Sequence, residues 1–589
     1  MKTTKKLKLG GLLLAIVAVF MLNTNANASN IQIPNEPTIE VAGLGEGGAG
    51  YMIVRFDLTW EFSWRSAQLR NWDAAWVFVK YRIGMDHWDH MFLDPTFNPN
   101  TGMNNNGVPM AFEYGMTPGA DLGAVGVFLF REQNGQGNNN WQNIGLRWRF
   151  DRENTYIGRP QLFPDDEVIV RVFAIEMVFI PEGPFFLGDG SNTPGVFTRA
   201  DEVFEQTATG LNIIRPFRVT SEAQPIGIAM RPTDSTGLDD VAGMLSAVGA
   251  QADVMSNTGF GIGTADNMAI TPQFPKGFQA FWIMKYEITQ SAYMDFLNTL
   301  EPAQQINRIR SAGTAALGER VMISPNVTVA AERTADRTQI VVVVPGVIEF
   351  GLATEFGGVA QSMGRGDVLA FLDWAGLRPM TELEFEKASR GPLSPIPGEF
   401  PWGATFASGA SVLADIANRN LPNEQVVNPT TANHNNSAAT RVISIGMVTR
   451  NGAFATATSD RIKAGATFWG VMEMGSNLAE PVINISTSWG RMFDGRHGDG
   501  RLNIDGDANV VNWPVPSELF EGLGHRGGNV NNFPVIPGGG LQTLSQRDVA
   551  QNSWDHEFWT GGRGVRTAAA AMTGPSGTPS PDPDPGSGS

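Results

Sequence analysis

Alternation of apolar and polar residues dominates the first part of the chain. It is clearest over residues 52–60, where apolar side chains occupy every second position and β-branched residues are enriched. Similar short stretches follow at residues 74–82, 125–131, 144–150 and 167–174. A period of two is typical of strands buried on one face. Turn-forming residues separate the stretches, as in the predicted turn over residues 132–138. The pattern predicts an antiparallel β-sandwich over residues 29–173.

A different pattern begins after residue 280. Residues 291–300 place Tyr293, Phe296 and Leu297 on one face of a predicted helix. Further along, five consecutive Ile and Val residues at 340–344 predict a buried strand. Helices and strands are therefore both expected in this part of the chain.

Local signals predict a second helix between Thr381 and Gly391. Thr381 is followed three residues later by Glu384, the spacing of a capping box at a helix start. Phe385 and Ala388 then face the core, and Gly391 ends the helix.

Composition limits the classes of function. The 589 residues are 42% hydrophobic and 10% aromatic, enough for two or three domains with large cores. The 68 Gly and 36 Pro residues predict many loops and turns. A formal net charge of -17 without a basic stripe argues against nucleic-acid binding. With no cysteine, the chain forms no disulfide.

The N-terminus has the features of a secretory signal. Lysines at positions 2, 5, 6 and 8 precede an apolar run over residues 12–22, and Ala26-Asn27-Ala28 is a cleavage site of the A-x-A type. We therefore expect residues 1–28 to be a signal peptide and the protein to be secreted, in the periplasm, at the cell surface or outside the cell. No second apolar run of about 18 residues occurs, so no membrane span is expected in the mature chain. Residues 573–589 are expected to be a disordered Pro/Gly/Ser linker tail.

The stretch over residues 470–480 reads Gly-Val-Met-Glu-Met-Gly-Ser-Asn-Leu-Ala-Glu. It resembles the G-L-Y-D-M-x-G-N-V-W-E motif of the formylglycine-generating-enzyme (sulfatase-modifying factor) family. Further stretches resemble other motifs of that family, in the family's order: residues 175–188, 281–290, 377–391, 401–403, 526–528 and 562–566. The resemblance implies a domain over residues 174–572, with insertions near 220–275 and 308–351. That fold is α+β with much irregular structure and is related to C-type lectins.

The resemblance also implies a chemistry that this chain lacks the residues to perform. The family oxidises a substrate cysteine and holds copper with its own reactive cysteines. Here Ser545 stands about where one of those cysteines would be expected. A hydroxyl cannot replace a thiolate as a soft copper ligand or in sulfur redox chemistry. We therefore expect a catalytically inactive domain without copper.

Another branch of the family binds iron through histidines. This chain has His87 and His90 within an Asp-His-Trp-Asp-His run, but that run lies outside the family-like domain. The remaining histidines are His434, His497, His525 and His556, and no H-x-x-x-H-x-E pattern occurs. The simplest interpretation of His87 and His90 is that they are exposed loop residues, so bound iron is not expected.

Calcium is the one cofactor that the resemblance favours. In the family, oxygen ligands near the G-N-x-W-E turn hold a structural Ca²⁺, and such hard ligands suit that ion. Asn477 and Glu480 occupy the matching positions, while Ala479 and Pro481 replace the flanking Trp residues. Asn477 and Glu480 are thus candidate metal ligands. The alternative, a Glu480 that only caps neighbouring amides, stays open.

The leading functional interpretation is a non-enzymatic structural or protein-interaction protein of the cell envelope or extracellular matrix. Its partners would be other envelope or matrix proteins, or further copies of itself. Two alternatives stay open. One is a glycan-binding, lectin-like surface protein, suggested by the many Trp and Asn residues. The other is an oxidoreductase with an unrecognised metal centre.

Overall fold

The structure is a computed structural model. It describes residues 31–42, 51–116, 123–148, 167–193, 195–199, 215–228, 244–247, 269–309, 316–322, 339–345, 349–353, 357–405, 416–418, 421, 423–426, 448–455, 459–475, 477–514, 522–529, 542–547 and 560–569.

A large antiparallel sheet of eleven strands organises the described part of the chain. Seven strands lie in the order β1-β2-β3-β8-β15-β23-β18, while β7 pairs with β2, β4 and β6 pair with β3, and β5 pairs with β6. The bounds are β1 Thr38–Ala42, β2 Tyr51–Ser66, β3 Asn71–Ile83, β4 Asp89–His90, β5 Met110–Met116, β6 Ala124–Arg131, β7 Gly135–Trp148, β8 Val168–Ile180, β15 Phe281–Met284, β18 Arg378–Pro379 and β23 Gly564–Thr567.

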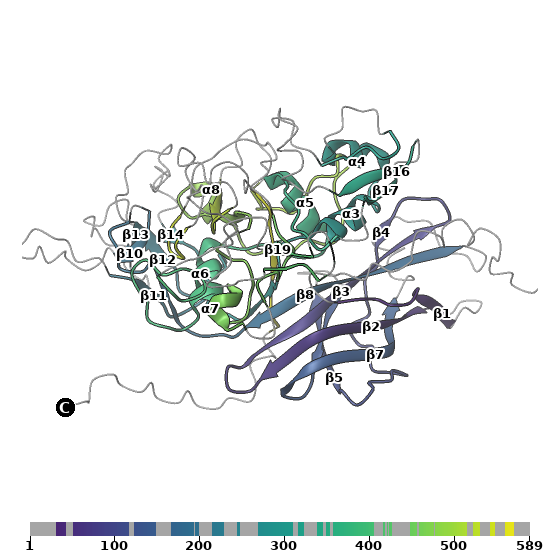
Figure 1. The fold of residues 1–589 in the computed structure, drawn as a ribbon, viewed down its shortest axis with the longest axis horizontal. Helices are drawn as coiled ribbons and strands as arrows, with labels where there is room; N and C mark the ends of the chain where they lie inside the picture. Colours follow the sequence, from purple (N-terminus) through teal and green to yellow (C-terminus); the bar gives the residue numbers. More distant parts are fainter. Residues whose placement is uncertain are drawn as a thin grey trace, which may run out of the picture.

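The central strand β3 is buried on both faces and separates two cores. Ala75, Val77 and Val79 point into a core that β3 shares with alternate residues of β2, β6 and β7. Trp76 and Phe78 point the other way, into a core built with helices α3 (Gln290–Leu297) and α5 (Arg365–Trp374). Figure 1 shows the long strands β2, β3, β7 and β8 on one side of the molecule and the helices on the other.

The remaining helices and strands are short. The helices are α4 Pro302–Arg308, α6 Glu382–Arg390, α7 Arg461–Ala464 and α8 Ser488–Arg491. One small sheet contains β10 Phe197–Arg199, β12 Ile226–Ile228, β13 Met244–Ala247 and β14 Ala269–Ile270. The two-stranded sheets pair β9 Phe185–Leu187 with β11 Phe217–Val219, β16 Ile340–Val344 with β17 Glu349–Leu352, β19 Ile416–Ala417 with β20 Gln425–Val426, and β21 Glu480–Ile483 with β22 Leu523–Arg526.

The class expected from the sequence agrees with this architecture. The described residues form mostly β-structure with some helix, dominated by a large antiparallel sheet. The stretches predicted at 52–60, 74–82 and 125–131 fall within β2, β3 and β6. The stretch at 144–150 overlaps the end of β7, with residues 149 and 150 outside the described residues, and the stretch at 167–174 coincides with the start of β8 from residue 168. The predicted turn over residues 132–138 is wrong in its second half, because β7 begins at Gly135 and pairs with the end of β2.

Both predicted helices are present. Helix α6 begins after Thr381, whose side chain accepts a hydrogen bond from the amide of Glu384, while Glu384 completes the capping box. Gly391 caps its end with a left-handed φ of 69°. Helix α3 ends at Leu297, earlier than predicted. Asn298 exchanges two hydrogen bonds with the backbone of Phe350 in β17, which turns the chain away from the helix axis.

The predicted border between residues 173 and 174 lies inside β8. Val172 pairs with Val79 and Ala174 pairs with Val77, so β8 runs beside β3 without interruption. Polar contacts also join β3 to later elements. Lys80 Nζ donates to the carbonyls of Trp374 and Gly500, at 2.8 and 2.6 Å. The two predicted segments therefore contribute to one continuous sheet.

No helix in the described part is long and apolar enough to cross a membrane. The predicted signal peptide and the predicted linker tail lie outside the described residues.

Candidate functional site

Helix α6 presents three ionised side chains from one of its faces. Glu382, Glu386 and Arg390 are spaced four residues apart, so successive turns stack them along the helix. All three are buried. The capping box orients the helix start, and Arg378 holds Glu384 through two hydrogen bonds of 2.8 and 2.6 Å. Local contacts therefore hold the start of the helix, in addition to the contacts of its charged face with other segments.

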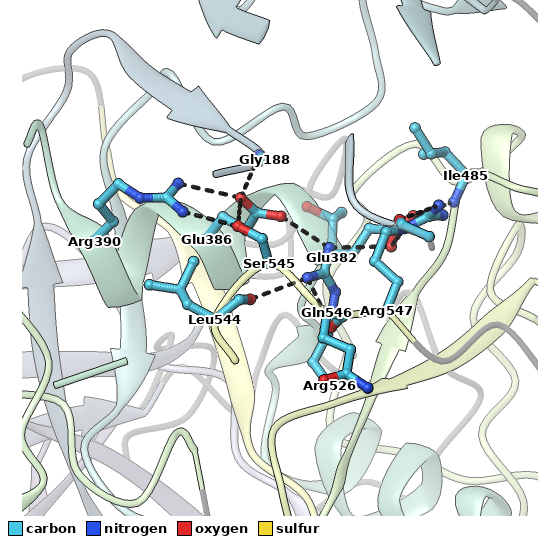
Figure 2. A network of polar contacts seen from close by, with 12 residues as sticks. Gly188, Glu382, Glu386, Arg390, Ile485, Arg526, Leu544, Ser545, Gln546 and Arg547 are labelled. Atoms are coloured by element: carbon cyan, nitrogen blue, oxygen red, sulfur yellow. Dashed lines mark hydrogen bonds and ion pairs between the residues drawn. The ribbon is translucent and has the colours of Figure 1, made fainter. Parts of the chain in front are cut away.

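Two arginines from the C-terminal part of the chain complete a buried network on this face (Figure 2). Arg547 donates from Nε and Nη2 to the two carboxylate oxygens of Glu382, at 2.6 and 2.8 Å. Arg526 Nη2 bridges Glu382 and Glu386, at 3.4 and 3.2 Å. Its Nη1 donates to the carbonyls of Leu544 and Gln546, which fixes the segment that contains Ser545.

Ser545 lies at the centre of this network. Its hydroxyl accepts a hydrogen bond from Arg390 Nη2 at 2.8 Å and donates to Glu386 at 3.3 Å. Glu386 also accepts from the amide of Gly188 at 2.8 Å. The Ser545 side chain is fully buried. The hydroxyl group therefore both accepts and donates a hydrogen bond within the network, and it links the guanidinium of Arg390 to the carboxylate of Glu386.

The network is balanced in charge. Arg390 also pairs with Glu399, so three carboxylates face three guanidinium groups. Burial alone would raise the pKa of Glu382, but Arg547 and then Arg526 outweigh it and hold that pKa below its usual value. The carboxylate stays ionised and paired. Such an arrangement orders the chain around α6, and its described carboxylates and the Ser545 hydroxyl are all hydrogen-bonded within it.

A second buried cluster contains both predicted metal ligands. Glu480 accepts three hydrogen bonds from Arg563, whose Nε lies 2.8 Å from each carboxylate oxygen. The remaining donors of Arg563 reach the carbonyls of Met284, Lys285 and Met472. Glu480 is therefore held as half of a buried ion pair.

Asn477 is tied to the same cluster through Glu287. Its Nδ2 donates to Glu287 at 2.5 Å, and its Oδ1 accepts from the amide of Thr449 at 3.0 Å. The other oxygen of Glu287 accepts from the amide of Leu478 at 3.0 Å. A left-handed φ of 69° at Asn477, which Asn tolerates well, gives the turn its shape. The structure thus brings Asn477 and Glu480 together, each bonded within the protein.

Glu473 is the member of the cluster with a free oxygen. One carboxylate oxygen accepts from the amide of Gly452 at 2.7 Å, while Oε2 is buried without a hydrogen-bond partner. The side-chain oxygen of Asn451, the residue before Gly452, is also buried without a partner. An unpaired buried acceptor is costly unless a proton, water or cation satisfies it.

The second cluster, unlike the first, is unbalanced in charge. Arg563 is the guanidinium that lowers the pKa of all three carboxyl groups, Glu287, Glu473 and Glu480, against the effect of burial. Burial first, and then the neighbouring Glu480, raise the pKa of Glu287 well above its usual value. Burial also raises the pKa of Glu473 to about 7. Protonation of these carboxyl groups therefore reduces the negative charge of the cluster, and a bound hard cation would reduce it as well.

The calcium site itself stays a prediction. Among the described residues, no group of three or more His, Asp or Glu side chains is arranged to hold a metal ion. The free oxygen of Glu473 fits a hard cation, whereas the side-chain atoms of Asn477 and Glu480 already have partners. If the cluster binds Ca²⁺, Glu473 supplies the available carboxylate oxygen.

The histidines of the described residues lie in separate surroundings. His87 is half exposed and contacts Asp86, while His90 is buried against the carbonyl of Val125 at 2.7 Å. His497 accepts from the amide of Thr567, and His525 lies 3.2 Å from an Arg365 nitrogen. The interpretation of His87 as an exposed loop residue holds, but for the buried His90 it is wrong. His434 and His556 lie outside the described residues.

Sequence reasoning missed Glu473 and Glu287 as members of the cluster. Both lie in stretches that resemble family motifs, and Glu473 stands between two methionines. A carboxyl group between apolar residues indicates that the group is buried, and that it is either paired with a cation or protonated. Comparisons with protein-family models and with the curated proteins find no match for this chain.

Proposed function

We propose that this is an exported, non-enzymatic structural or protein-interaction protein of the cell envelope or extracellular matrix. The observation that carries the proposal is the state of Ser545. Where the resembled enzymes would have a reactive thiol, this chain has a buried hydroxyl bonded to Arg390 and Glu386. The chain has no cysteine to supply the thiol from elsewhere. In this proposal the chain keeps the scaffold of the resembled family and lacks the cysteines that the family uses for its redox chemistry.

The proposal includes a division of the chain. Residues 29–173 would form a β-sandwich around the core between β2–β7 and β3–β6, and residues 174–572 a domain similar to the formylglycine-generating-enzyme fold. The capped helix α6 and the Glu480–Arg563 pair join stretches that resemble motifs of that family. The insertions near 220–275 and 308–351 would extend its surface. The secretory signal supports export.

The proposed ligand is a structural calcium ion at the Glu287–Glu473–Glu480 cluster. Excess buried negative charge and the unpartnered Oε2 of Glu473 support it. The ion would stabilise the turn and supply no chemistry. We propose other envelope or matrix proteins, or further copies of the chain, as partners.

Metal analysis and an activity assay together test the proposal. Protein purified from its native envelope should carry no stoichiometric copper or iron and should not oxidise a cysteine-containing peptide to an aldehyde. It should instead co-purify with other envelope proteins or form large particles in light scattering. One equivalent of copper or iron per chain, with turnover of the peptide, would establish the oxidoreductase alternative and overturn the proposal.

A further inference from the structure

Two stretches of the N-terminal segment are rich in side-chain amides and free of charge. Between residues 133 and 146, eight of fourteen residues are Asn or Gln, and none is charged. Between residues 95 and 112, five are Asn and again none is charged. Amide side chains each offer a donor and an acceptor, so such stretches favour hydrogen bonding to neutral partners.

The fold places these two stretches side by side. Along β7, Gln136, Asn138 and Asn140 are exposed, while Asn139 and Trp141 between them are buried. The loop before β5 borders this strand: the Asn104 amide donates to the Gln142 carbonyl at 2.9 Å, and Asn106 Nδ2 donates to the Asn140 carbonyl at 2.8 Å. The exposed amides form one surface, here called the amide face: Asn104, Asn106, Gln136, Asn138, Asn140 and Gln142.

An exposed aromatic ring stands at the edge of the amide face. Phe62 lies in a bulge of β2 opposite β7, and its amide donates to the Asn138 side chain at 3.3 Å. Its backbone has a left-handed φ of 57°, and its side chain is 72% exposed. A bulky residue in this conformation is strained, and bulges re-aim side chains. The fold therefore holds Phe62 in a strained backbone conformation with its ring exposed to solvent.

We propose that the amide face and Phe62 bind a neutral polysaccharide. The ring of Phe62 would stack against the apolar face of a sugar, and the amides would pair with its hydroxyl groups. Acidic glycans and nucleic acids fit poorly, because the formal net charge is -17 and Glu61 is exposed beside the ring. The inference goes beyond the proposed protein partners by adding a polysaccharide ligand, rests on the proposed place in the envelope or matrix, and uses none of the residues of the α6 network.

Binding to soluble polysaccharides tests this assignment with the full mature chain. Affinity electrophoresis in gels that contain a mannan, a β-glucan or an alginate compares two neutral polymers with an acidic one. The wild-type protein should be retarded by at least one neutral polymer and not by alginate. Phe62→Gly should weaken that binding about tenfold, a large and easily measured change in retardation. Glycine suits the left-handed backbone, so this variant should keep its fold.

Trp489→Ala is the matched control, because Trp489 is a 53% exposed aromatic on α8, far along the chain from the amide face. It should bind like the wild type. Wild-type protein that binds neither neutral polymer overturns the proposal, and so does Phe62→Gly binding like the wild type or a Trp489→Ala loss of equal size. If Phe62→Gly instead changes only self-association in sedimentation, the face is an interface between copies and the proposal is wrong. Copper, iron or peptide oxidation would overturn the proposed function and leave this result intact.

Discussion

Arg563 holds Glu480 in a bidentate ion pair, with Nε 2.8 Å from both carboxylate oxygens. Both side chains are fully buried. The pair connects the stretch over residues 470–480 to the segment that enters β23, which lies between β15 and the last strand β18 of the large sheet. A turn and a strand of this sheet therefore share one contact, and this contact lies inside a cluster with further negative charge.

Removing Arg563 should destabilise the protein strongly. Arg563→Met leaves Glu480 buried without its partner, a loss of about 3–5 kcal/mol in the free energy of unfolding. Urea unfolding followed by tryptophan fluorescence measures it. Arg496→Met is the control, because Arg496 pairs with Asp494 at the surface and should cost about 1 kcal/mol or less. Equal losses in the two variants would contradict a dominant role for the buried pair.

Chelation of calcium should lower the melting temperature if the second cluster binds the ion. Binding at about 100 times Kd adds ~2.7 kcal/mol to the native state, a shift of a few degrees for a large domain. Glu473→Gln should abolish the dependence on calcium, since it removes the free carboxylate and leaves the Arg563 pair. Glu480→Gln should abolish it as well if Glu480 is a ligand. A wild-type melting curve that ignores the chelator would mean that Glu480 is only a structural partner.

The local part of this architecture could be predicted from the sequence, and the long-range part could not. Thr381, Glu384 and Gly391 specify helix α6 within eleven residues, because capping depends on neighbours in the chain. The pairing of β3 with β8 joins residues about a hundred positions apart. Alternation reveals that each is a strand and says nothing about which strands pair.

The amide-rich start of β7 shows where composition misleads. Gly and Asn are depleted in strands, so residues 135–138 were expected to form a turn. Pairing with β2 overrides that preference. The buried cluster was hidden for a related reason: Glu287 meets Asn477 across the fold, and one sequence does not show that contact. Only the resemblance placed Asn477 and Glu480 near each other and near a possible ion.

The contribution of Glu473 and Glu113 to stability should fall as the pH rises from about 5 to about 8 in the presence of a chelator. Burial raises the pKa of Glu473 and of Glu113 to about 7, from an ordinary value of 4.5. Between these values the folded protein binds protons that the unfolded chain releases, so the free energy of unfolding decreases with pH. The loss should be on the order of a few kcal/mol and complete by about pH 8, once both groups have titrated in the folded protein.

Urea midpoints at pH 5 and pH 8 measure this dependence. Glu473→Gln should flatten it, because glutamine does not titrate and resembles the protonated acid. Equal changes of midpoint between pH 5 and pH 8 in the wild type and in Glu473→Gln would show that Glu473 is not the buried, proton-binding group that the geometry describes.

The mature protein should begin at Ser29. The Ala-x-Ala site at residues 26–28 follows the charged and apolar regions of a secretory signal. Ile31 is buried, and Gln32 pairs with Thr59 of β2, so the chain is packed against the sheet soon after this site. N-terminal sequencing of protein from its native host decides the question. An intact Met1 would remove the basis for export.

Replacing Ser545 tests whether this residue is structural or a remnant of catalysis. Ser545→Ala should lower the free energy of unfolding by about 1–3 kcal/mol, because Arg390 and Glu386 each lose a buried hydrogen-bond partner. Ser394→Ala, at an exposed position, should stay within about 0.5 kcal/mol of the wild type. Ser545→Cys should gain neither copper binding nor peptide oxidation, because a single buried thiol lacks a second cysteine. Copper bound by that variant in an active form would show that the scaffold retains a catalytic site and that Ser545 alone keeps it silent.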